Sequence, residues 1–184
     1  MRNFFYWLLV CCPLFSHPHV FVEAGFEVVL EKEKAHVRVL WQFDEMTSMM
    51  LLMDFDTNGD GILDAKEVAF LKEHAFDHLE PFGYYTAIGK KGEETPPPAL
   101  SFFHARAQGV HLFYEFAFSF PLKPNTKTLT LGCYDEDNLV AFFLKGPLSV
   151  TSPLKNRQIS YHTKRENRDF YDASLLQIMW KDAP

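Results

Sequence analysis

The chain has 184 residues, of which 18 are Lys or Arg and 24 are Asp or Glu, so its formal net charge is −6. An acidic chain without a basic stripe is unsuited to nucleic acid or to an anionic membrane surface, and we expect neither as a partner. The length is sufficient for one domain with a hydrophobic core and short for two.

The amino terminus has the pattern of a secretory signal peptide over residues 1–16. Arg2 precedes an apolar run from Phe4 to Val10, and Ser16 supplies a small residue at the expected cleavage point. The apolar run is shorter than the roughly 20 residues of a membrane-spanning helix. We therefore predict export and a mature domain of residues 17–184, with an uncleaved anchor as the alternative.

Cysteine usage gives no disulfide framework to the mature chain. Cys11 and Cys12 fall in the signal segment, which leaves Cys133 alone. Because Cys133 lies among strand-forming residues, we expect a buried, unreactive thiol rather than a nucleophile or a metal ligand.

Two histidines open the predicted mature chain. His17 and His19 are two residues apart, so on an extended chain they share one face, and neutral imidazole is a common ligand of zinc, nickel and copper. Pro18 lacks a backbone N–H, which excludes the tight copper or nickel mode that uses intervening amide nitrogens. The alternative is a strand that begins with two exposed polar residues.

Strict alternation of apolar and polar residues follows. Residues 20–30 place apolar side chains on one face, a charged turn follows at residues 31–34, and residues 37–43 alternate again. Two half-buried strands with a short turn predict an antiparallel hairpin.

Residues 56–67, DTNGDGILDAKE, match the twelve-residue calcium loop of an EF-hand, and the sequences on both sides predict helices over about residues 46–79. A frame that starts at Asp54 fails because its twelfth position is Ala65, which offers no side-chain oxygen. Gly61 falls where the loop must turn sharply. The predicted ligands are side-chain oxygens of Asp56, Asn58 and Asp60, the carbonyl of Ile62, a water-bridged contact from Asp64 and both carboxylate oxygens of Glu67.

A second loop of this kind is missing from the sequence, whereas calcium sensors usually carry pairs. A solitary loop in an exported protein belongs with the extracellular modules that bind Ca²⁺ at about 10⁻⁴–10⁻³ M. We therefore predict a structural clip rather than a switch, with a solvated acidic turn as the alternative.

The remainder of the chain predicts a series of strands. The clearest is residues 110–120, and a charged connector (residues 164–167) is expected between the last two. The predicted fold class is α+β, a β-rich antiparallel sandwich-like domain with an inserted helix–loop–helix calcium motif. The other predicted strands cover residues 84–88, 101–107, 126–134, 139–144, 157–163 and 174–180.

Other histidines offer weaker patterns. His74 and His78 lie four apart on the second predicted helix, so they share a face, but the string HAFDH lacks the glutamate of the zinc-protease motif. His36, His104 and His111 are scattered over predicted strands. The sequence contains no nucleophile elbow, phosphate loop or dinucleotide fingerprint, so we expect neither an enzyme nor a small organic substrate.

Five segments in order along the chain resemble a bacterial periplasmic family called domain of unknown function 1007: HPHVFVEA, WQFDEMTSMMLLMDFDTNGDG, EPFGYYTAIGKKGE, FAFSFPL and YDEDNLVAFFL. They span residues 17–144, and the last 40 residues have no counterpart among these motifs. Members are commonly encoded near nickel/cobalt-type membrane permeases, and one branch is associated with zinc uptake.

The resemblance implies a periplasmic accessory role in transition-metal transport beside an integral-membrane permease, with Ca²⁺ in the loop and Ni²⁺, Co²⁺ or Zn²⁺ at His17 and His19. A second hypothesis is a calcium-stabilised interaction module that docks to a membrane partner and binds no transition metal. A third, a copper enzyme using the amino-terminal histidines, has the least support.

Overall fold

Two β-sheets form most of the molecule. The computed structural model describes residues 18–168 and 171–182. A five-stranded sheet has the order β4-β5-β2-β1-β7, and a four-stranded sheet has the order β3-β6-β9-β8. The strands are β1 (Val20–Leu30), β2 (Lys34–Phe43), β3 (Thr86–Ile88), β4 (Phe102–Gln108), β5 (His111–Pro121), β6 (Thr128–Cys133), β7 (Val140–Thr151), β8 (Arg157–Arg168) and β9 (Tyr171–Asp182).

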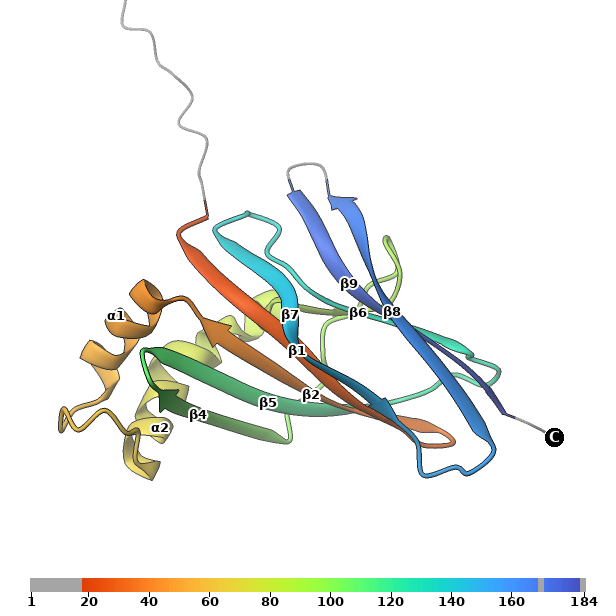
Figure 1. Ribbon diagram of the computed structural model, residues 1–184, viewed down its shortest axis with the longest axis horizontal. Helices are drawn as coiled ribbons and strands as arrows, with labels where there is room; N and C mark the ends of the chain where they lie inside the picture. The colour runs from red at the N-terminus through yellow and green to blue at the C-terminus, as the bar shows by residue number, and fades with distance from the viewer. Residues whose placement is uncertain (1–17, 169–170, 183–184) are drawn as a thin grey trace, which may run out of the picture.

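The predicted β-rich class is confirmed, and the first hairpin forms in the predicted place. β1 and β2 pair antiparallel, with Phe26 opposite Val39. The expected antiparallel arrangement is wrong for one pair of strands, because β1 pairs parallel with β7. This pairing places a strand from late in the chain beside the first one (Figure 1).

Aromatic side chains dominate the core. Trp41 on β2 packs edge to face against Phe116 on β5, with ring centroids 5.0 Å apart. Phe76, which follows the helices, stacks on Phe103 of β4 at 4.1 Å and is fully buried. The alternating phenylalanines of β5 therefore build the core, as strand spacing predicts, and anchor the helical segment to the sheet.

A glycine lets β1 and β7 approach closely. The register of the parallel pair shifts between Ala24 and Phe26. A Cβ atom on Gly25 would lie 2.5 Å from the carbonyl oxygen of Pro147, well inside van der Waals contact. Only glycine fits at this irregularity without moving the backbone of β7.

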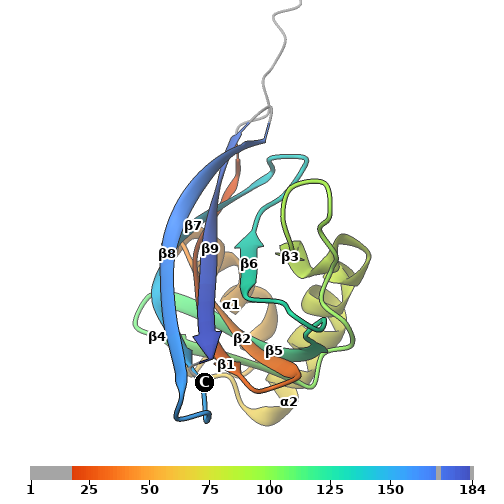
Figure 2. The ribbon, with the colours of Figure 1, turned by 90° about the vertical axis from the view of Figure 1, so that its right-hand side faces the viewer.

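The helical segment connects β2 to β3 and lies beside β4 and β5 (Figures 1 and 2). Helix α1 (Glu45–Phe55) starts at Asp44, whose carboxylate accepts a hydrogen bond from the Thr47 amide at 2.9 Å. Ser48 ties α1 to the sheet, since its hydroxyl accepts from the Leu112 amide at 2.9 Å. None of the helices in the described part of the chain is long and apolar enough to span a membrane.

The second predicted helix is interrupted. Helix α2 (Ala65–Leu71) continues as a π-helical turn, η1 (Lys72–Phe76), and then as 3₁₀ turns, η2 (Asp77–Tyr85). Tyr84 and Tyr85, predicted as the start of a strand, instead have left-handed φ angles of 51° and 47°. The strand begins only at Thr86 because these two residues turn the chain.

The charged connector predicted at residues 164–167 is wrong, because these residues lie inside β8. Lys164 pairs with Glu166 at 2.9 Å, and Arg168 pairs with the other carboxylate oxygen of Glu166 at 2.7 Å. Opposite charges two residues apart face the same side of a strand, so they neutralise one another there. β7 likewise extends to Thr151, past the predicted end at residue 144.

Candidate calcium site and a second, acidic pocket

The loop between α1 and α2 is ordered by its own side chains. The carboxylate of Asp56 accepts hydrogen bonds from the Gly59 and Gly61 amides at 2.9 and 2.8 Å. The side-chain oxygen of Asn58 accepts from the Asp60 amide at 2.8 Å, and that of Asp60 accepts from the Ile62 amide at 2.8 Å. Each predicted ligand at the first, third and fifth positions therefore turns back over the loop.

Gly61 occupies the sharp turn that the sequence predicts. Its φ angle is +78°, in the left-handed region that glycine adopts at little cost. The next two side chains differ in solvent exposure: Ile62 is 68% exposed, whereas Leu63 is buried in the core. Leu63, the apolar residue at the eighth loop position, thus holds the loop against the hydrophobic core.

Glu67 closes the loop from the first turn of α2. It is only 4% exposed. Its Oε1 accepts from the amide and the hydroxyl of Thr57 at 2.8 and 2.9 Å, and its Oε2 accepts from the Asp64 amide at 2.9 Å. Hydrogen bonds from Asp64 and then from Thr57 lower the pKa of Glu67, so its charged form is favoured.

Asp64 begins α2 as an N-cap. Its carboxylate accepts from the Lys66 and Glu67 amides at 2.7 and 2.9 Å, and the reciprocal bond to Glu67 completes a capping box. The last two predicted ligands are therefore also the residues that start the second helix, so loop and helix form as one unit.

The donor set suits calcium chemically, because it consists of hard oxygen atoms. Within residues 18–168 and 171–182, no group of three or more His, Cys, Asp or Glu side chains converges as a metal cluster. The oxygens instead hold backbone amides. An ion held by both oxygens of Glu67 would compete with the amide and hydroxyl of Thr57 for Oε1 and with the Asp64 amide for Oε2.

The predicted transition-metal histidines are placed only in part. His17 lies outside the described residues. His19 is exposed just before β1, and its amide donates to the Leu139 carbonyl at 2.9 Å. The structure therefore puts His19 on the surface where β1 and β7 begin.

Three further histidines have separate partners. His36 lies 2.8 Å from the Ser119 hydroxyl, His111 lies 2.9 Å from the Phe43 carbonyl, and His74 lies 3.0 Å from the Phe70 carbonyl. The predicted pairing of His74 with His78 depended on regular helical spacing. That spacing is lost where α2 gives way to π and 3₁₀ turns.

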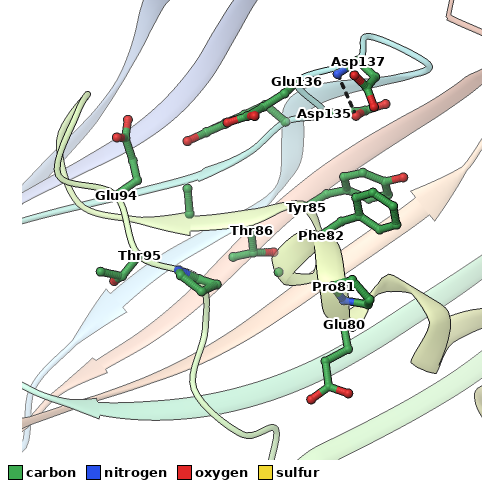
Figure 3. A pocket seen from close by; sticks show the side chains of 14 residues that line it. Glu80, Pro81, Phe82, Tyr85, Thr86, Glu94, Thr95, Asp135, Glu136 and Asp137 are labelled. Carbon is green, nitrogen blue, oxygen red and sulfur yellow. Dashed lines mark hydrogen bonds between the residues drawn. The ribbon is translucent and has the colours of Figure 1, made fainter.

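A pocket of about 500 Å³ lies on the side of the fold where η2, the loop before β4 and the turn after β6 meet. Figure 3 shows the rings of Phe82 and Tyr85 side by side in it, below Asp135 and Asp137. These two rings are stacked with centroids 5.9 Å apart. Two of the segments that carry the family resemblance, EPFGYY and YDEDN, thus meet in space.

The lining of this pocket is acidic and contains no Lys, Arg or His. Asp135 is buried and structural, since it accepts from the Leu139 and Val140 amides at 2.8 and 3.0 Å. Burial, followed by the charges of Asp135 and Asp137, raises the pKa of Tyr85. Glu94 is paired with Arg168 at 2.7 Å, so the negative charge of the lining comes mainly from its other acidic residues. Its acidic members are Glu80, Glu94, Asp135, Glu136 and Asp137.

No local sequence pattern predicts this pocket, because its walls come from segments about 50 residues apart. In the structure, the run Gly83-Tyr84-Tyr85 in its wall has left-handed φ angles of 47–59°. Two tyrosines in this region are strained relative to glycine, and such strain often accompanies functional surfaces.

The family of the chain follows from comparison with known proteins. The sequence profile described as "Protein of unknown function (DUF1007)" matches residues 3–173. The chain belongs to the DUF1007 family. The match extends well past residue 144, so β8 and the start of β9 also belong to the DUF1007 pattern, although the motifs recognised in the sequence end at residue 144.

A relative and a solved structure complete the comparison. The DUF1007 chain is 32% identical over 105 residues to the "Uncharacterized 15.5 kDa protein in trpE 3'region" of Spirochaeta aurantia, covering 54% of this chain and 74% of the relative. AChBP from Bulinus truncatus shares 8% identity over 91% of this chain and 90% of that structure, with a TM-score of 0.36. This score is too low to support a conclusion about fold or function.

Proposed function

We propose that this protein is a calcium-binding periplasmic accessory protein, without enzymatic activity, that supports the transport of nickel, cobalt or zinc. The observation that carries the calcium part is the hydrogen-bond network of residues 56–67. Side chains at the loop positions where an EF-hand supplies ligands already fold back over the backbone.

The residues that would hold Ca²⁺ are Asp56, Asn58, Asp60 and Glu67 through side-chain oxygens, Ile62 through its carbonyl, and Asp64 through water. The ion would supply positive charge to a loop that gathers four carboxylates and one lysine, Lys66. Its effect is structural: Glu67 belongs to α2 and Asp56 ends α1, so an ion shared by both ties the two helices together.

Calorimetric titration with CaCl₂ tests the calcium part. We expect one ion per chain with a dissociation constant of about 10⁻⁴–10⁻³ M and no detectable binding by Asp56→Ala. Asp54→Ala is the matched control, because Asp54 is exposed and lies outside the loop frame. Binding that survives Asp56→Ala, or that is lost equally in Asp54→Ala, contradicts the assignment.

The transport part rests on the family resemblance and on the exposed position of His19 at the start of β1. Its test is titration of the calcium-loaded protein with Zn²⁺, Ni²⁺ and Co²⁺, compared with a His17→Ala/His19→Ala variant. Weaker binding by the variant supports the proposal. Equal binding by both proteins, or none by either, removes the metal-handling role.

A calcium-stabilised interaction module that docks to a membrane partner is the second candidate. One observation favours it: Phe21 on β1 and Phe143 on β7 stack at 6.4 Å while they are 42% and 40% exposed. Exposed aromatic pairs are frequent in protein interfaces. This candidate is favoured over the first if the Phe21→Ser/Phe143→Ser variant loses metal transport while the His17→Ala/His19→Ala variant retains it.

A further inference from the structure

Helix α1 presents four methionines to solvent. Met46, Met49, Met50 and Met53 are 56%, 57%, 59% and 77% exposed. Their spacing of three and four residues places them on one face of the helix. We call this set the methionine face.

The opposite side of α1 already supplies the contacts that hold the helix. Ser48 and Phe55 are buried, and Leu51 and Leu52 pack partly against the core. The helix is therefore apolar on both sides although only one side is covered. A helix that is apolar all round is normally buried, so the methionine face needs an explanation beyond folding.

Methionine is not used as a core filler in this protein. Among the described residues, the buried apolar set contains Phe, Leu, Val, Ile, Ala, Trp, Tyr and Cys but no Met. The other described methionine, Met179 on β9, is 37% exposed. Four of the six methionines in the chain thus lie within eight residues on one exposed surface, which directs attention to the thioether group.

Two of these thioethers share one hollow. Met49 and Met53 are one helical turn apart, and both line a depression of about 470 Å³ with Leu52 and Val110. Glu45 and Asp56 line the same depression, so its electrostatic potential attracts cations. The unbranched methionine side chain has three rotatable bonds, which lets neighbouring sulfur atoms adjust to a common ligand.

Thioether sulfur is a soft ligand that selects Cu(I), whereas Ca²⁺ takes hard oxygen atoms and imidazole suits zinc or nickel. We propose that the methionine face of α1 binds a soft monovalent metal ion, Cu(I), between Met49 and Met53, with Met46 or Met50 supplying a third sulfur. Ag(I) has the same charge and softness and serves as a stable probe. The inference is independent of the proposed function, because none of the four methionines is a predicted calcium or histidine-site ligand.

Nuclear magnetic resonance of protein labelled with [methyl-¹³C]methionine reads the site directly. We expect Ag(I) to shift the methyl signals of Met49, Met53 and at least one of Met46 and Met50, and to leave that of Met179 unchanged. The titration is made on calcium-saturated protein, because Asp56 lines the same depression, and excess Zn²⁺ should not reproduce the shifts. Signals that do not move, or that move equally at Met179, overturn the proposal.

A Met→Leu series separates metal binding from apolar packing, since leucine keeps the apolar surface but removes the sulfur. Anaerobic competition with a chromogenic Cu(I) chelator should show affinity reduced by more than about tenfold in Met49→Leu/Met53→Leu, as loss of direct ligands requires. Met179→Leu is the matched control. All variants carry Cys11→Ser and Cys12→Ser, and Cys133 is buried. Unchanged Cu(I) affinity in the double variant overturns the proposed site. This outcome would leave the proposed calcium binding at residues 56–67 unaffected.

Discussion

Thr57 donates two hydrogen bonds to Oε1 of Glu67, one from its amide at 2.8 Å and one from its hydroxyl at 2.9 Å. The two residues are ten apart, at opposite ends of the same loop. Their contact closes the loop into a ring and joins the end of α1 to the start of α2. The same carboxylate is the predicted twelfth-position calcium ligand, so loop closure and ion binding depend on one side chain.

The hydroxyl of Thr57 should stabilise the calcium-free protein. Thr57→Val removes this donor to a charged acceptor and keeps the β-branched shape, so we expect the free energy of unfolding to fall by about 1–2 kcal/mol. Urea denaturation in the presence of a calcium chelator measures the change. Thr57→Ser retains a hydroxyl and should stay within about 0.5 kcal/mol of the native protein. No loss in Thr57→Val, or a larger loss in Thr57→Ser than in Thr57→Val, would show that the hydroxyl hydrogen bond is not the main contribution of this side chain.

Calcium should raise the melting temperature. At an ion concentration 10–100 times the dissociation constant, binding adds about 1.4–2.7 kcal/mol to stability, which corresponds to about 3–10 °C for a chain of this size. Differential scanning calorimetry with 10 mM CaCl₂, about 10–100 times the expected dissociation constant, measures the shift against 10 mM MgCl₂. Asp60→Asn/Glu67→Gln should abolish it. A shift of the same size with magnesium would argue against a calcium-selective loop.

Acid should remove the contribution of Glu67 to stability. Hydrogen bonds from Asp64 and Thr57 lower the pKa of this carboxyl from 4.5 in the folded protein. Ionised Glu67 therefore stabilises the fold above about pH 4.5, and this contribution is lost as the pH falls through the lowered folded-state pKa. In calcium-free buffer, the difference in melting temperature between native protein and Glu67→Gln should be constant near neutral pH and shrink below about pH 4.5. A difference that grows on acidification contradicts this sign.

Gly25→Ala should destabilise the β1–β7 pair. The new methyl group would meet the Pro147 carbonyl at 2.5 Å, and backbone cannot yield as easily as a side chain. We expect a loss of about 1–3 kcal/mol, typical of overpacking, measured by urea denaturation. Ser149→Ala, an exposed change further along the same pair, should have little effect. A stable Gly25→Ala protein would mean that β7 can move away from β1 at low cost.

The thiol of Cys133 should be unreactive in the folded protein. Burial raises its pKa to about 11, so the thiolate, which is the nucleophile, is scarce at neutral pH. Mass-spectrometric mapping after treatment with iodoacetamide at pH 8 should find Cys133 unmodified, and modified once the protein is unfolded in guanidinium chloride. Modification at similar rates in both states would indicate frequent opening of the core around β6.

Short-range sequence patterns predicted the strands and the loop whose conformation depends on residues close together in the sequence. Alternation located β1, β2 and β5, and the glycine and acidic positions of residues 56–67 located the loop between two helices. The strand through Lys164–Asn167 was missed because its charges are balanced within the folded strand, as in the Lys164–Glu166 pair at 2.9 Å, and the neighbouring Arg168 is balanced by Glu94 at 2.7 Å, far away in the sequence. The pocket around Tyr85 and Asp135 was missed for the same reason, since its walls meet only in the folded state.

The parallel pairing of β1 with β7 has a consequence for how the chain reaches its native state. The register brings Val20 beside Val140, so the contact closes a loop of about 120 residues, and loop closure over such distances is entropically costly and slow. Until the second half of the chain arrives, β1 exposes one unpaired backbone edge, to which other chains can add. Assembly of the five-stranded sheet is thus a late event, and shielding of that edge during synthesis would determine the yield of soluble protein.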